Sequence, residues 1–141
     1  LLLATLEQVG EVVVFAKHMC MLDFLEEKLR GVTYMRIDGS VSQERRETHV
    51  RNFQAGKCRV ALLSIGAAST GITLTKASVM LFVELDWNPA TLRQAEDRIH
   101  RIGQDRACDI RYVLATGTID EMIYRKINCK AEIIAQVLGD C

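Results

Sequence analysis

The sequence has few of the residues that mark disulfide-bonded or metal-scaffolded proteins, and it has no long apolar run. Its five cysteines are odd in number and include no C-x-x-C pair, so neither a disulfide framework nor a metal site is expected. The apolar runs fall well short of the ~18 residues of a membrane span, so no membrane contact is expected. Three of the five cysteines lie inside or beside apolar segments, which is typical of reduced, buried thiols. The five are Cys20, Cys58, Cys108, Cys129 and Cys141.

An excess of charge of one sign is also missing. The 18 Lys and Arg residues balance the 18 Asp and Glu residues, so binding to nucleic acid would have to come from a local patch. With 141 residues, 49% of them hydrophobic, the chain can bury the core of one ordinary domain. We therefore expect a single domain over residues 1–141. Because the sequence begins without Met, in the middle of an apolar pattern, we expect it to be a fragment of a longer protein.

The spacing of hydrophobic residues predicts strands that alternate with helices. Short β-branched and apolar runs predict strands over residues 11–16, 32–37, 59–65, 79–85 and 110–115. Apolar residues at every third or fourth position predict helices over residues 18–30, 42–54 and 89–103, and from residue 118 onward. This alternation is typical of an α/β fold with a doubly wound parallel sheet and helices on both faces.

Local signals fix several helix starts. Ser42, Asn88 and Thr118 are expected to be N-caps, because their side chains can accept a hydrogen bond from the first helical turn. The last helix is expected to bury one apolar face. That face consists of Ile119, Met122, Ile123, Ile127, Ile133, Ile134 and Val137.

The stretch from Gln94 to Gln104 is the most informative part of the sequence. In the helix predicted between Pro89 and Gly103, the residues Gln94, Arg98 and Arg101 lie on one side. Two guanidinium groups one turn apart repel each other unless an anion lies between them, and their planar donors match phosphate oxygens. A polyphosphate is therefore the predicted ligand.

A simpler interpretation of the same helix stays open. Asp97 could pair with Arg101 and Arg93 with Asp97, each four residues apart, on an ordinary exposed surface. In the polyphosphate interpretation an apolar stripe of the helix is buried, while both arginine side chains remain accessible to the ligand. The stripe consists of Leu92, Ala95, Ile99 and Ile102.

Two loops follow predicted strands at the edge where ligands of open α/β sheets bind. In residues 36–40, Gly39 frees the backbone and Ser40 offers a hydroxyl and an N–H to a phosphate, although the same residues also suit an ordinary turn. Residues 63–74 are small wherever a nucleotide or a phosphate backbone would approach.

The second loop does not form a phosphate-binding P-loop. Gly66 and Gly71 have the outer spacing of that motif, but Ile72 stands where lysine is required. The chain is therefore not expected to hydrolyse ATP by itself.

Other polar and aromatic residues allow two interpretations each. Trp87 either anchors the following helix on the sheet or contacts nucleic acid. Lys17 and His18 either face a DNA backbone or are simply solvated. His49 and His100 have no metal-ligand spacing and are expected to be structural or solvent-facing.

From about Val12 to Leu138 the sequence resembles the C-terminal RecA-like lobe of Swi/Snf-family ATPases, which belong to the superfamily-2 helicases. Residues 94–104 look like motif VI and residues 63–74 resemble motif V. Ala68-Ser69 and Thr73 differ from the residues usual in chromatin-remodelling members. With the Glu84-x-x-Trp-Asn-Pro pattern, they look like the annealing-helicase, fork-remodelling branch.

The resemblance implies roles for individual residues. Arg98 and Arg101 would be arginine fingers, which are catalytic groups that reach the transferring phosphoryl group of ATP. Gln94 would position them near the γ-phosphate, and Gly71 would belong to a turn that faces the nucleotide. The residues toward the DNA backbone would be Ser64, Arg36, Ser40 and Lys17.

The resemblance also implies partners and a cellular location. ATP and Mg²⁺ would be bound mainly by an N-terminal RecA-like lobe of the same polypeptide, and DNA would be held through its phosphates without sequence preference. The protein would be nuclear and would act in DNA repair at replication forks. Two alternatives stay open: an RNA or chromatin-remodelling helicase lobe of the same superfamily, and a non-enzymatic interaction module. Asp97 before Arg98 speaks against the RNA-directed form.

Overall fold

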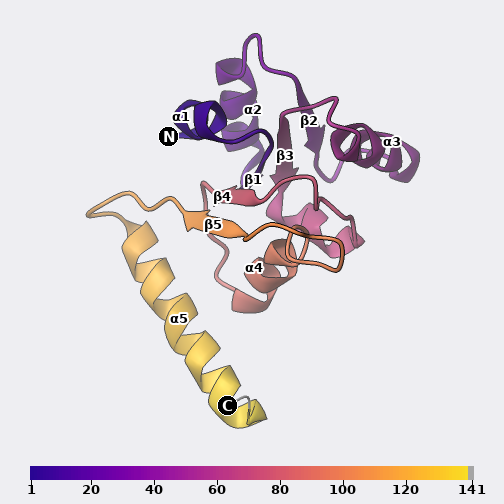
Figure 1. Cartoon of the computed structure of the whole chain (residues 1–141). Helices are drawn as coiled ribbons and strands as arrows, with labels where there is room; N and C mark the ends of the chain where they lie inside the picture. The colour runs from indigo at the N-terminus through magenta and orange to yellow at the C-terminus, as the bar shows by residue number, and fades with distance from the viewer. Residues whose placement is uncertain (140–141) are drawn as a thin grey trace.

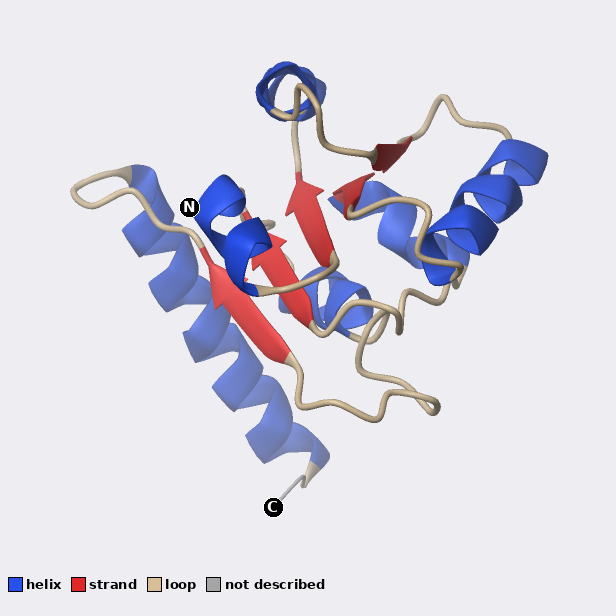
Figure 2. Ribbon diagram, turned by 45° about the horizontal axis from the view of Figure 1, so that its top comes forward, coloured by secondary structure: helices blue, strands red, loops and turns tan. Residues whose placement is uncertain are grey.

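The computed structural model describes residues 1–139, which form a five-stranded sheet with helices on both faces (Figures 1 and 2). The strands lie in the order β2-β3-β1-β4-β5, and all neighbouring strands are parallel. The predicted α/β class is confirmed, and each of the five predicted strands is present but shorter than predicted. The strands are β1 (Val12–Ala16), β2 (Tyr34–Ile37), β3 (Val60–Ser64), β4 (Val79–Phe82) and β5 (Asp109–Tyr112).

Six helical segments accompany the strands among the described residues. Two of them were not predicted: the N-terminal helix, whose Leu6 is buried, and the short 3₁₀ helix in the stretch of small residues. The segments are α1 (Leu2–Gln8), α2 (Met19–Lys28), α3 (Gln43–Gln54), η1 (Ile65–Thr70), α4 (Pro89–Glu96) and α5 (Ile119–Leu138). None of these helices is both long and apolar enough to span a membrane.

Period-two alternation along the strands divides the core into two layers. Val12 and Val14 pack with α1 and α2 on one face of the sheet, whereas Val13 and Phe15 pack with α3, η1, α4 and α5 on the other. Successive side chains of a strand point to opposite faces, so a strand covered on both sides is apolar throughout. All five residues of β1 are buried.

The caps expected from the sequence are confirmed. The side chain of Ser42 accepts a hydrogen bond from the Arg45 amide, that of Asn88 from Ala90, and that of Thr118 from Asp120. These three helices therefore begin where local hydrogen bonding favours a start.

The last helix buries less than predicted. Ile123 and Ile127 are buried, but the other five residues of the expected apolar face are exposed. For Ile133, Ile134 and Val137 the reason is geometric, because the C-terminal half of α5 extends past the body of the sheet (Figure 1). The exposed five are Ile119, Met122, Ile133, Ile134 and Val137.

Among the cysteines that the structure describes none is fully buried, and the expected burial is met only in part, by Cys58 and Cys108, which pack against the core. Cys20 and Cys129 are exposed, and Cys58 and Cys108 are half-buried, all with free thiols. Cys141 lies outside the described residues.

Candidate functional site

The helix that was expected to carry both arginines ends before it reaches them. α4 stops at Glu96, with Asp97 as its C-cap, and the chain continues as an irregular turn to Gly103. The Arg98 carbonyl accepts a hydrogen bond from the Leu74 amide at 2.8 Å. Because that carbonyl is occupied by another segment, the α-helical pattern is not continued beyond it. Arg98 and Arg101 therefore lie on a turn that is shaped by tertiary contacts.

The apolar residues beside the arginines follow the prediction except at the end. Leu92, Ala95 and Ile99 are buried, whereas Ile102 is fully exposed. The loss of the helix after Glu96 accounts for this difference, since the helical spacing no longer directs Ile102 toward the core.

The Arg98 side chain is buried against backbone carbonyls. Only 8% of the residue is exposed. Its Nε donates to the Gln94 carbonyl at 2.9 Å, and its Nη1 donates to the Ile72 carbonyl at 3.5 Å. The guanidinium group is thus fixed beside the segment that follows η1.

Arg101 reaches the same segment from the surface. Its Nη1 donates to the Gly71 carbonyl at 3.2 Å and to the Thr73 hydroxyl at 3.0 Å. Gly71 has a φ of +70°, which favours glycine, and a Cβ added there would lie 4.0 Å from Nη1 of Arg98. The structure therefore brings Gly71, Arg98 and Arg101 together, as the sequence predicted.

Neither arginine has a carboxylate partner in the part of the chain that the structure describes. The ion pairs within residues 1–139 involve other residues, so the Asp97–Arg101 and Arg93–Asp97 pairs of the simpler interpretation do not form. Burial, together with the nearby charge of Arg101, lowers the pKa of Arg98. An arginine nevertheless stays charged in proteins, so an anion placed between the two groups would relieve their repulsion.

An open groove adjoins the pair, with a volume of ≈ 830 Å³. Its walls are mainly polar and include three arginines and a glutamine from the turn and the residues after it. The groove is lined by Thr73, Asp97, Arg98, His100, Arg101, Ile102, Gln104, Arg106, Ala107 and Cys108.

Gln94 lies beside the pair through its backbone only. Its carbonyl accepts from Arg98, while the residue lines a different groove, between α4 and α5, together with Ala131 and Ile134. No hydrogen bond joins its side chain to either arginine within residues 1–139.

The arginine pair does not lie at the carboxyl edge of the sheet, from which the loops at residues 36–40 and 63–74 start. α4 starts after the carboxyl end of β4, and the chain then runs back toward the start of that strand. There the Gln104 side chain donates to the Ala77 carbonyl, and the Asp109 amide donates to the Ser78 carbonyl. Both acceptors belong to the segment that enters β4. The predicted residues consequently form two separate groups.

The second group lies where the strands end. Ser64 is the register partner of Ala16, so it lies next to the end of the strand that Lys17 follows. Lys17 Nζ is 3.5 Å from Asp86. The backbone amides of Lys17 and His18 each donate to Glu84 Oε2 at 2.8 Å. Positive charge at this edge is thus partly balanced by carboxylates.

Glu84 holds the β1–α2 connection in place. Burial raises its pKa, but hydrogen bonds from His18 and from the Lys17 amide outweigh this effect and lower the pKa below its usual value. The carboxylate therefore remains ionised and continues to accept these bonds.

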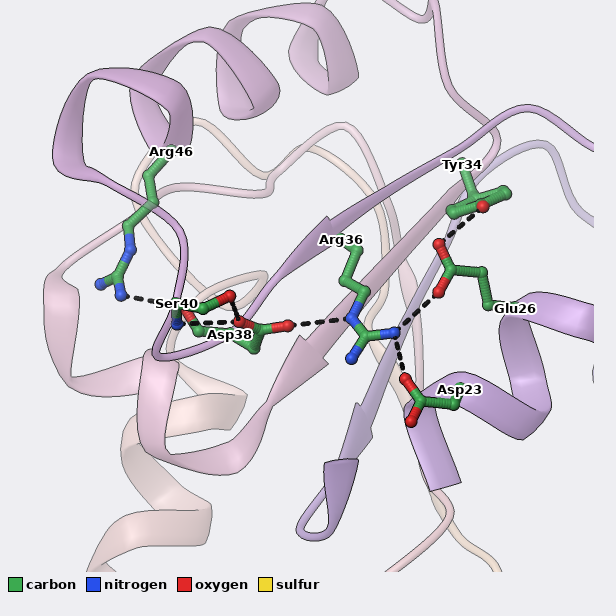
Figure 3. A network of polar contacts seen from close by, with 7 residues as sticks. All are labelled: Asp23, Glu26, Tyr34, Arg36, Asp38, Ser40 and Arg46. Atoms are coloured by element: carbon green, nitrogen blue, oxygen red, sulfur yellow. Dashed lines mark hydrogen bonds and ion pairs between the residues drawn. The ribbon is translucent and has the colours of Figure 1, made fainter. Parts of the chain in front are cut away.

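Arg36 is surrounded by carboxylates (Figure 3). Its Nε donates to Asp38 at 2.9 Å, and its Nη1 donates to Asp23 and Glu26, each at 2.7 Å. Burial lowers the pKa of Arg36, but hydrogen bonds to Asp23, Asp38 and Glu26 raise it overall. A contact between this guanidinium group and a DNA phosphate would compete with three carboxylates.

Ser40 is also engaged within this network. Its hydroxyl and its amide donate to Asp38 Oδ1 at 2.6 and 2.9 Å, while Arg46 donates to the Asp38 carbonyl at 3.0 Å. Both donors that were predicted for a phosphate thus serve an internal turn. Arg36 and Ser40 order the loop after β2 in this structure.

Asp38 provides a test of that network. Hydrogen bonds from Ser40, against the opposing effect of burial and with the help of Arg36, lower the pKa of Asp38. We expect Asp38→Asn to lower the free energy of unfolding by about 1–3 kcal/mol near neutral pH. The sign follows from linkage: this stabilisation is present above the unfolded pKa of about 4 and is lost as the pH falls through the lower folded value.

Urea denaturation of this chain at several pH values measures the effect. The difference between Asp38→Asn and the wild type should shrink in acid. Asp105→Asn is the matched control, because Asp105 is exposed and accepts no hydrogen bond within residues 1–139, so we expect little change. Equal losses in both variants would contradict a structural role for Asp38.

Trp87 packs toward α5 rather than onto α4. Lys126 Nζ lies 5.7 Å from the ring centroid, and Lys130 donates to the Trp87 carbonyl at 3.2 Å. The indole also lines a groove with Ile133 and Ile134. It is 37% exposed, so its contacts fix the loop before α4 against the last helix.

Sequence reasoning missed three residues near the arginines. Thr73 accepts from Arg101, Tyr112 donates to Glu96 at the end of α4, and Gln104 binds three carbonyls. For Gln104 the only signal in the sequence was its position at the end of the motif. For Thr73 it was the difference from the residue usual in chromatin-remodelling members. The contact of Tyr112 could not be found, because it joins elements that are separated in sequence.

The fold and the arginine turn define the class of protein. Residues 1–103 match the family described as the helicase conserved C-terminal domain, and the chain belongs to that family. The structure is similar to the C-terminal part of the Fun30 ATPase domain, with a TM-score of 0.82 at 28% identity over 86% of this chain and 40% of that chain. The fold is therefore that of a RecA-like helicase lobe.

Similar proteins indicate the branch of the family. The chain is 44% identical over 128 residues to the SWI/SNF-related matrix-associated actin-dependent regulator of chromatin subfamily A-like protein 1 of Drosophila melanogaster, covering 89% of this chain and 17% of that protein. It is 45% identical over 129 residues to the human DNA annealing helicase and endonuclease ZRANB3, covering 89% of this chain and 12% of that protein. The chain is thus a C-terminal lobe of the Swi/Snf family, and it spans less than a fifth of these relatives.

Proposed function

We propose that this chain is the second motor lobe of an ATP-dependent DNA translocase of the annealing-helicase kind. The observation that carries the proposal is the pair Arg98 and Arg101, which have no carboxylate partner within residues 1–139 and lie beside the groove at Gly71–Thr73. Phosphate oxygens are the ligands that such a pair binds best.

ATP would be shared between this chain and an N-terminal lobe of the same polypeptide. When bound there, ATP supplies the phosphoryl group that is transferred to water. Arg101 would donate to the γ-phosphate oxygens and would neutralise charge that develops as the bond to the leaving group breaks. Arg98, fixed against the Gln94 and Ile72 carbonyls, would add a second positive charge close by. Gln94 would act by shaping the turn through its carbonyl.

Mg²⁺ would be held by the other lobe. Within residues 1–139 no group of three or more His, Cys, Asp or Glu side chains is placed to hold a metal ion, whereas the arginines fit the phosphates themselves. The two lobes would close when ATP binds and part after its release, which moves the motor along DNA.

DNA would lie along the carboxyl edge of the sheet. Lys17 and Ser64 are neighbours there, and the Arg36–Ser40 loop flanks them through β2 and β3. Contacts to phosphates are independent of sequence and weaken as salt rises. η1 connects Ser64 to Gly71, so one short helix would link the DNA edge to the ATP face. A DNA-directed motor of this family would be nuclear and would serve DNA repair at replication forks.

The test is ATP hydrolysis by the full-length protein with competing nucleic acids. We expect duplex or forked DNA to stimulate hydrolysis and RNA of the same length to stimulate it far less, with the stimulation falling as salt is raised. Stimulation by RNA above that by DNA would replace the proposal with the RNA-helicase alternative. The absence of ATP hydrolysis with either nucleic acid would favour the non-enzymatic interaction module.

A further inference from the structure

Gln104 joins two segments that are otherwise separate in the sequence. Its amide nitrogen Nε2 lies 3.1 Å from the Thr75 carbonyl, 2.7 Å from that of Ala77 and 3.3 Å from that of Ile99. Its Oε1 accepts from the Arg106 amide at 3.2 Å. Two N–H groups shared among three carbonyls form a dense set of contacts for a single side chain.

These contacts fasten the end of the arginine turn. The turn follows Glu96, the last residue of α4, and is held near its start by the bond between the Leu74 amide and the Arg98 carbonyl. Backbone bonds of the i→i−4 kind extend only as far as His100, whose amide donates to the Glu96 carbonyl at 3.2 Å, so they do not fix the rest of the turn. Gln104 supplies the second point of attachment, three residues after Arg101.

The contacts at Arg98 and at Gln104 both join the turn to residues 71–77, the segment that Arg101 also contacts. Arg101 donates to Gly71 and Thr73, while Gln104 binds Thr75 and Ala77 on the same stretch of chain. The direction of the Arg101 side chain therefore depends on how the turn is seated on residues 71–77. Gln104 also lines the groove that adjoins the arginines.

We propose that Gln104 is a positioning residue for the arginine pair: it holds the turn on residues 71–77 so that Arg101 points to the transferring phosphoryl group. The inference rests on the proposed function of the pair. A misplacement of about 1 Å in such a group costs on the order of a hundredfold in rate.

A second glutamine offers a matched control. Gln54, at the end of α3, binds the same segment from the other side: its Nε2 donates to the Thr75 hydroxyl at 3.0 Å, and its Oε1 accepts from the Lys76 amide at 2.9 Å. Gln54 touches the segment but not the turn. A comparison of variants at Gln54 and Gln104 therefore distinguishes two effects: the loss of hydrogen bonds to residues 75–77 in general, and the displacement of Arg101.

The test is steady-state ATP hydrolysis by full-length Gln104→Glu and Gln54→Glu with saturating DNA. A carboxylate at residue 104 would face three carbonyl oxygens and repel them. We expect kcat of Gln104→Glu to fall by about 10- to 100-fold, with KM for ATP changed less than about threefold because the other lobe holds most of the nucleotide. Gln54→Glu should stay within about twofold of the wild type.

A variant that combines Gln104→Glu with Arg101→Ala shows whether Gln104 affects turnover through Arg101. If Gln104 acts through Arg101, adding Gln104→Glu to Arg101→Ala should lower kcat by less than about twofold further. The same drop in both backgrounds, or unchanged turnover of Gln104→Glu beside a DNA-stimulated wild type, overturns the inference and leaves the proposed function intact. An inactive wild type overturns the proposed function instead. Should Gln104→Glu fail to fold, Gln104→Met removes the same hydrogen bonds without a charge, and the same outcomes decide.

Discussion

Replacing Arg101 with alanine in the full-length protein is expected to lower kcat for DNA-stimulated ATP hydrolysis by about a thousandfold or more. The reason is that Arg101 is exposed, lies at the groove and donates only to a backbone carbonyl and a hydroxyl, so its charge remains available to a phosphate. Its loss removes positive charge where negative charge develops. Steady-state turnover with saturating ATP and DNA measures the effect.

Three comparisons sharpen this experiment. Arg93→Ala is the matched control, because Arg93 is an exposed arginine on α4 that does not line the groove of the pair, and we expect its turnover to stay within about twofold. Arg101→Lys should restore only part of the rate, since an ammonium group keeps the charge but lacks the planar donors. The free energy of unfolding of Arg101→Ala should change by less than about 1 kcal/mol. Wild-type turnover in Arg101→Ala would contradict the finger assignment.

Replacing Arg98 with alanine is expected to reduce turnover to a similar degree and also to destabilise the fold. Arg98 is buried and donates to the Gln94 and Ile72 carbonyls. Alanine would leave these acceptors without their partner and would remove the packing of the side-chain stem. We expect the free energy of unfolding to fall by about 2–4 kcal/mol.

Urea denaturation and ATP hydrolysis together distinguish the two arginines. Arg98→Ala should lose both stability and rate, whereas Arg101→Ala should lose rate alone. The Arg101→Ala variant is therefore the control for stability, and the Arg93→Ala variant is the control for rate. An Arg98→Ala protein as stable as the wild type would show that the carbonyl contacts of Arg98 contribute nothing measurable to the fold.

The layout of the sheet was predictable because its signals are local. A run such as Val12–Phe15 has no polar residue to expose, so it indicates a strand that is covered on both faces. Ser42, Asn88 and Thr118 fixed helix starts because an N-cap needs only its own side chain and the next turn. Each of these signals lies within a few residues of the feature that it predicts.

The end of α4 was not predictable from the same signals. Gly103 suggested a helix that ends there, because glycine suits the residue after the last helical turn, and the spacing of Ala95 and Ile99 agreed with it. The helix stops earlier, at Glu96, and Leu74, 24 residues before Arg98, takes the Arg98 carbonyl. The spacing of apolar residues carries no information about a hydrogen bond from a distant segment that competes with the helix.

The candidate site was likewise predictable in part. The sequence grouped Gly71 with the arginines correctly, because the resemblance assigned all three to the nucleotide. It could not foresee that Asp23 and Glu26, on α2, would meet Arg36 on β2. A charged side chain and its partners can be far apart in the sequence, so the sequence alone does not tell an arginine that is already paired from one that is free for a ligand.

The most direct test of the account is a structure of the full-length protein with DNA, ADP and aluminium fluoride, which occupies the place of the transferring phosphoryl group. We predict that a guanidinium nitrogen of Arg101 lies within about 3 Å of a fluoride atom, with Arg98 beside it and Gln104 still bound to residues 75–77. Arg101 still bound to the Gly71 carbonyl, with the fluoride contacted only by the other lobe, would contradict the claim that this pair completes the ATP site.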